Sequence, residues 1–63
     1  MNQTKEGEME TEIIGYRTEK MEEGTGFFFL GSAINRANQD GSLNVIKETT
    51  TPWGITSEVF YSL

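Results

Sequence analysis

The residues Phe27-Phe28-Phe29-Leu30 form the longest uninterrupted apolar stretch of the chain, and the expected fold depends on them. In a β-strand, successive side chains point to opposite faces, so Phe27 and Phe29 would leave one face and Phe28 and Leu30 the other. A strand that is apolar on both faces needs a cover on both. Because a chain of 63 residues can hardly supply two covers, the stretch predicts either a tightly curled barrel or a second chain packed against the sheet.

The composition leaves few other ways to stabilise so small a core. A single core of this size rarely contributes more than about 3–5 kcal/mol, so small scaffolds usually depend on disulfides, metals or oligomers. The chain contains no cysteine and no histidine, which excludes disulfides and zinc sites built from these residues. Oligomerisation is the remaining common stabiliser, and we therefore expect a homo-oligomer.

Alternating apolar and polar residues extend the β pattern to both sides of the aromatic stretch. The four expected strands are residues 9–18, 25–34, 43–50 and 55–63. Asp40-Gly41 favours a tight turn between the second and third strands, although residues 35–39 could instead belong to a longer loop. Pro52 and Gly54 favour a second turn before the last strand.

The predicted fold is therefore all-β. It is a small four-stranded antiparallel meander that forms a curled sheet or an SH3-like barrel and associates with a second copy. Residues 1–8 are expected to form a flexible polar tail, and residues 9–63 a single small β domain.

The charge of the chain is negative and unevenly distributed. Its formal net charge is −5, and seven of the ten acidic residues lie within the first 23 residues. Nucleic-acid affinity comes mainly from clustered Lys and Arg, so direct binding to nucleic acid is not expected. Glu8, Glu10 and Glu12 would share one strand face and present three carboxylates to a basic partner. The alternative is that they only solvate a strand edge and protect it from aggregation.

The residue types that most catalytic mechanisms need are missing. Histidine, which titrates near neutral pH, is absent, and so is a cysteine nucleophile. We therefore expect a protein that is not an enzyme. The resemblance of residues 36–47 to a calcium loop fails as well, because Arg36 and Lys47 occupy the two positions that need acidic ligands. No metal or other cofactor is expected.

The expected partner-binding residues are the apolar stretch, the single tryptophan and the acidic row: Phe27, Phe28, Phe29, Leu30, Trp53, Glu8, Glu10 and Glu12. Trp53 lies at the tip of a predicted turn, and tryptophan is over-represented among the residues that dominate protein interfaces. The alternative is that Trp53 folds back and caps the core.

These observations predict a non-catalytic protein-binding module or small regulator that acts as a homo-oligomer through apolar strand faces. A second partner would be a protein with a basic or apolar surface. Two other functions fit the sequence: an acidic inhibitor that mimics nucleic acid in the groove of a DNA- or RNA-handling enzyme, or a structural subunit of a larger, for example viral, assembly. The lack of cysteine, of a signal peptide and of a membrane-spanning stretch favours the cytoplasm.

Overall fold

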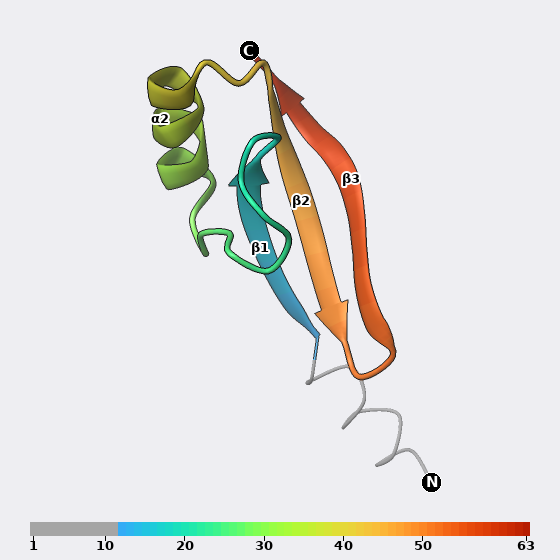
Figure 1. Ribbon diagram of the computed structural model, residues 1–63. Helices are drawn as coiled ribbons and strands as arrows, with labels where there is room; N and C mark the ends of the chain where they lie inside the picture. Colours follow the sequence, from blue (N-terminus) through green and yellow to red (C-terminus); the bar gives the residue numbers. More distant parts are fainter. Residues whose placement is uncertain (1–11) are drawn as a thin grey trace, which may run out of the picture.

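Residues 12–63 are described by the computed structural model, in which three antiparallel strands form a sheet and one short helix lies beside it (Figure 1). The elements in chain order are β1 (Ile13–Thr18), α2 (Leu30–Asp40), β2 (Asn44–Thr51) and β3 (Gly54–Ser62). The strand order is β1-β2-β3, so β2 is central and the described strands do not close into a barrel. Residues 1–8, the predicted tail, and residues 9–11 of the predicted first strand lie outside the described residues.

The predicted second strand, residues 25–34, is wrong. Phe27 is its only residue that pairs with the sheet, through two backbone hydrogen bonds of 2.7 and 2.6 Å exchanged with Tyr16. From Leu30 onward the chain is helical. Residues 12–63 thus contain three strands, and neither the four-stranded meander nor the SH3-like barrel is confirmed. The coarser prediction of a mostly β, antiparallel structure is correct.

α2 forms because its apolar residues follow the period of a helix. Spacings of three and four residues put four of them on one face: Leu30, Ala33, Ile34 and Ala37. Gly41 ends the helix with φ 80°, in the left-handed region, and its N–H donates to the carbonyl of Ala37 at 3.0 Å. The pair Asp40-Gly41, predicted to be a hairpin turn, is therefore the end of a helix.

The hairpin predicted near the C-terminal end of the sequence is confirmed. Thr51 pairs with Gly54 across the two-residue turn Pro52-Trp53. Gly54 adopts φ 137°, which residues with a Cβ rarely do, so glycine suits this position. β2 and β3 agree with the predicted third and fourth strands to within one residue at each end.

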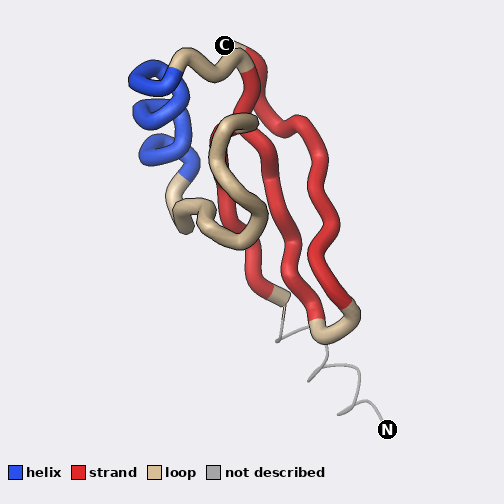
Figure 2. The backbone as a smooth tube through the Cα atoms, viewed as in Figure 1, coloured by secondary structure: helices blue, strands red, loops and turns tan. Residues whose placement is uncertain are grey.

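The core is small and lies between α2 and one end of the sheet. Its fully buried apolar residues are Ala33, Ala37 and Val45. The partly buried residues packed around them are Tyr16, Phe27, Leu30 and Ile34. Within the described residues, α2 contacts β1 and β2 but not β3, which forms the opposite edge of the sheet (Figure 2). All nine residues of β3 are consequently exposed.

Candidate protein-binding surface

A largely buried ion pair fixes the long loop that connects β1 to α2. Arg17 Nε lies 2.6 Å from Glu48 Oε2, which joins β1 to β2. The same carboxylate accepts a hydrogen bond from the backbone N–H of Gly24 at 3.2 Å, and the Arg17 guanidinium donates to the carbonyl of Met21 at 3.1 Å. Two charged side chains thus hold the loop against the sheet at two points.

Gly26 lets the loop return to the edge of β1. A Cβ at this position would lie 2.8 Å from the carbonyl oxygen of Tyr16, which is closer than real Cβ contacts allow. The glycine therefore permits the close backbone approach that pairs Phe27 with Tyr16.

The apolar stretch is divided between the core and the surface. Phe27 and Leu30 pack against the core. Phe27 forms the bridge to β1, and Leu30 is the first residue of α2. Phe28 and Phe29 lie between them in a bend, and each is 75% exposed. The prediction that one strand presents apolar residues on two faces is wrong. Two of the four side chains are nevertheless on the surface.

Trp53 lies apart from these phenylalanines. It occupies the tip of the β2–β3 hairpin, away from α2 and from the segment that leads into it (Figure 1). Its backbone N–H donates to Thr51 Oγ1 at 3.2 Å, and the residue is 76% exposed. The tryptophan does not cap the core, and the structure does not bring it together with Phe28 and Phe29.

Strand β3 adds a third exposed apolar region, which the sequence analysis did not include among the partner-binding residues. Its large exposed apolar residues are Ile55, Val59, Phe60 and Tyr61. Phe60 packs beside Tyr16, with ring centroids 5.4 Å apart, and Lys47 Nζ lies 5.6 Å from the centre of the Phe60 ring. The signal was present in the sequence, because apolar residues occur on both faces of the last predicted strand, and the last strand of a meander lies at an edge.

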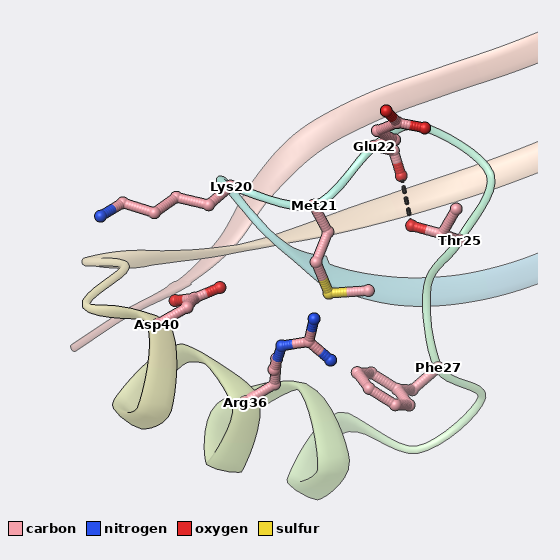
Figure 3. A pocket seen from close by; sticks show the side chains of 7 residues that line it. All are labelled: Lys20, Met21, Glu22, Thr25, Phe27, Arg36 and Asp40. Atoms are coloured by element: carbon pink, nitrogen blue, oxygen red, sulfur yellow. Dashed lines mark hydrogen bonds between the residues drawn. The ribbon is translucent and has the colours of Figure 1, made fainter.

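An open groove of about 540 Å³ separates the loop from α2 (Figure 3). It is lined by Lys20, Met21, Glu22, Thr25, Phe27, Arg36 and Asp40. Met21, Phe27 and Arg36 point toward the same space, and Thr25 Oγ1 donates to the carbonyl of Glu22 at 2.6 Å. The lining has mixed charge and contains neither an activated nucleophile nor a histidine base. No cluster within residues 12–63 has the composition to hold a metal ion.

Two carboxylates connect the ends of the elements. Asp40 accepts hydrogen bonds from the Ser42 N–H at 2.9 Å and from Thr18 Oγ1 at 2.7 Å, and hydrogen bonding by Ser42 and Thr18 lowers its pKa. Glu19 accepts from Leu43 N–H and Asn44 Nδ2, both at 3.0 Å, which lowers its pKa as well. In both residues the hydrogen bonds stabilise the charged carboxylate. A carboxylate that stays charged suits a structural role better than proton transfer at neutral pH.

The acidic row is only partly visible. Glu8 and Glu10 lie outside the described residues, and Glu12 is exposed immediately before β1.

No family model, curated protein or solved structure matches the chain. α2, the helix of the described region, is too short and too polar to cross a bilayer.

Proposed function

We propose that this protein is a non-catalytic protein-binding module that acts as a homo-oligomer through its exposed apolar surface. The observation that carries the proposal is β3: all nine of its residues are exposed, and in the described region no other element lies against its faces or its outer edge. Val59, at the middle of this surface, is 60% exposed. Removing apolar surface from water contributes roughly 25 cal/mol per Å², so association through β3 stabilises the folded chain.

The size of the core supports the same proposal. Three fully buried apolar residues, two of them alanines, make up its centre. Such a core contributes little to the free energy of unfolding, because alanine buries only a small side chain. A second copy that covers β3 adds the apolar burial that one chain lacks.

Sedimentation equilibrium and thermal unfolding over a wide range of protein concentration test the proposal. We expect the weight-average mass to rise above that of one chain, and the midpoint of unfolding to rise with concentration. A strict monomer at high micromolar concentration, with cooperative unfolding at a fixed midpoint, would contradict the proposal.

Phe28 and Phe29 support a second, different partner within the same function. Phe28 lines a second, smaller hollow over β1 and β2, Phe29 follows it in the same bend, and β3 forms the opposite edge of the sheet. A protein with an apolar surface could bind there while β3 is occupied by a second copy. The substitutions Phe28→Ser and Phe29→Ser, with Val59→Ser as the matched control, would separate the two surfaces.

The acidic inhibitor and the structural subunit remain alternatives. Three acids of residues 12–63 already use their carboxylates in internal contacts: Glu19, Asp40 and Glu48. Mimicry of nucleic acid would therefore depend on the other acids, among them the predicted row Glu8, Glu10 and Glu12. We propose that the module acts in the cytoplasm, because a chain without cysteine suits a reducing compartment.

A further inference from the structure

Among residues 12–63, nothing protects the long outer edge of β3. β3 pairs with β2 along one side, and within the described residues nothing pairs with its other side. Native proteins usually protect such an edge with Lys, Pro or a covering element. β3 contains neither lysine nor proline, and Glu58 is its single charged residue. The edge of β1, in contrast, pairs with Phe27 at Tyr16.

The hairpin determines which backbone groups this edge offers. Thr51 and Gly54 pair across a two-residue turn, so they exchange hydrogen bonds, and such pairs recur at every second residue of an antiparallel ladder. Gly54, Thr56 and Glu58 therefore direct their N–H and C=O groups toward β2. The residues between them direct theirs outward: Ile55, Ser57 and Val59.

A register shift ends this regular edge. Ile46 pairs with Val59 and Val45 pairs with Tyr61, which leaves Phe60 as the extra residue of a β-bulge. The uninterrupted part of the edge is therefore centred on Ser57, with Ile55 and Val59 at equal distances on its two sides.

We infer that two copies of this chain pair antiparallel along β3, with Ser57 opposite Ser57 of the second copy on the two-fold axis. This inference rests on the proposed function and specifies its contact. Ile55 then lies opposite Val59 of the second copy, so all three outward-facing residues pair. The result is one continuous six-stranded sheet in place of two exposed three-stranded ones.

The other residue pairs of this register are also compatible with strand pairing. Thr56 lies opposite Glu58 of the second copy, where its hydroxyl can donate to the carboxylate. Gly54 lies opposite Phe60, whose ring can cover the exposed glycine backbone. A register centred on Glu58 would instead place two carboxylates opposite each other, and it would need backbone groups that already bond to β2.

The charge distribution permits this approach. Two chains of formal net charge −5 repel each other unless the contact avoids their acids. In the described residues, Glu19, Glu22 and Glu23 belong to the loop between β1 and α2, and Asp40 ends α2, which contacts β1 and β2 but not β3. The β3 edge is the opposite edge of the sheet from β1 and contributes Glu58 alone.

Disulfide trapping tests the register, because the chain contains no cysteine of its own. Ile55→Cys and Val59→Cys are made as separate variants and mixed under mild oxidation. Cα atoms of directly opposite residues lie about 5.5 Å apart, within the range that a disulfide spans. We expect a cross-linked dimer that contains one chain of each variant.

Each variant alone is the matched control. Position 55 of one copy lies about four residues, or roughly 13 Å, along the strand from position 55 of the other, beyond the reach of a disulfide. Neither Ile55→Cys nor Val59→Cys alone should then cross-link efficiently. Ser57→Cys should cross-link with itself, which provides a second reading if a substitution at 55 or 59 disturbs folding.

The outcomes separate this inference from the proposed function. Preferential linkage of 55 to 59, and of 57 to 57, supports the register. A dimer in sedimentation whose single variants at 55 and 59 cross-link as readily as their mixture would overturn the β3 register and leave the homo-oligomer intact. A monomer in sedimentation would overturn both.

Discussion

Arg17 and Glu48 connect three segments that are far apart in the sequence. Their ion pair joins β1 to β2, and hydrogen bonds from Gly24 and to Met21 add the loop. Because the side chain of Glu48 is only 5% exposed, its carboxylate oxygens contact these partners rather than water. The pair therefore determines where the loop places Phe27.

Replacement of Glu48 by alanine should be strongly destabilising. It leaves the Arg17 guanidinium without its partner in a mostly buried position, which costs about 3–5 kcal/mol in the free energy of unfolding. Urea unfolding measures this change, and amide exchange at Gly24 should accelerate as the loop is released. Glu23→Ala, an exposed loop substitution, is the control and should change the stability by less than about 0.5 kcal/mol. Equal effects of the two substitutions would contradict the structural role of the pair.

Two glycines allow a second prediction at the residue scale. Gly26→Ala should destabilise by about 1–3 kcal/mol, because the new Cβ would meet the backbone of Tyr16 at 2.8 Å. Gly31→Ala should stabilise by about 0.5 kcal/mol, because it has open space around it and lies in α2. Thermal unfolding of both variants checks the opposite signs. A neutral Gly26→Ala would mean that the close approach of loop and strand is not required.

At the scale of the elements, a strand or helix could be predicted from the sequence only where its apolar residues followed one clear spacing, two residues for a strand or three to four for a helix. β2 and β3 were predictable because alternation and a Pro-Trp-Gly turn agree there. In residues 27–34, four large apolar residues in a row favour a strand, whereas the helical spacing of Leu30, Ala33, Ile34 and Ala37 rests partly on two alanines. Alanine is a weak marker of a buried face, so the local pattern predicted the wrong element. The apolar face of the helix packs against Val45, which lies 8 residues after Ala37, and this contact outside the local sequence favours the helix over the strand.

The junction between α2 and β2 should make the fold sensitive to acid. Hydrogen bonding by Ser42 and Thr18 lowers the pKa of Asp40 below its ordinary 3.8, and bonds from Leu43 and Asn44 lower that of Glu19 below 4.5. The unfolded chain therefore takes up protons at a higher pH than the folded one. The stabilisation is fully present above the ordinary pKa values and is lost as the pH falls through the lower, folded-state values.

Urea unfolding at neutral pH and below pH 3.8 measures this loss for the natural chain. In Asp40→Asn we expect a lower stability at neutral pH and a smaller further loss in acid, because the titrating group is gone. Thr18→Val removes one of the same hydrogen bonds from the other side and should also reduce the acid sensitivity. If Asp40→Asn loses as much stability in acid as the natural chain, the junction does not contribute to the acid sensitivity.

At the scale of the whole molecule, the sequence indicated an excess of apolar surface but located it only in part. Phe28, Phe29 and Trp53 were predicted as surface residues for partners, and all three are exposed, although Phe28 and Phe29 lie in a bend rather than in a strand. β3 was not singled out, because exposure of a strand depends on where the other elements pack. In the described region α2 contacts β1 and β2 but not β3. The apolar residues on both faces of the last predicted strand indicated that it needs a cover, but not that the helix lies against other strands.

Ser57→Lys should convert the proposed dimer into a monomer. On the two-fold axis, two lysines would lie opposite each other at about 5.5 Å between Cα atoms, and like charges in directly opposed positions destabilise strand pairing. Sedimentation should show one chain, and the midpoint of unfolding should lose its dependence on protein concentration. Asn38→Lys, on the exposed surface of α2, changes the net charge equally and should stay dimeric. If both variants sediment as dimers, the contact lies elsewhere than at the edge of β3.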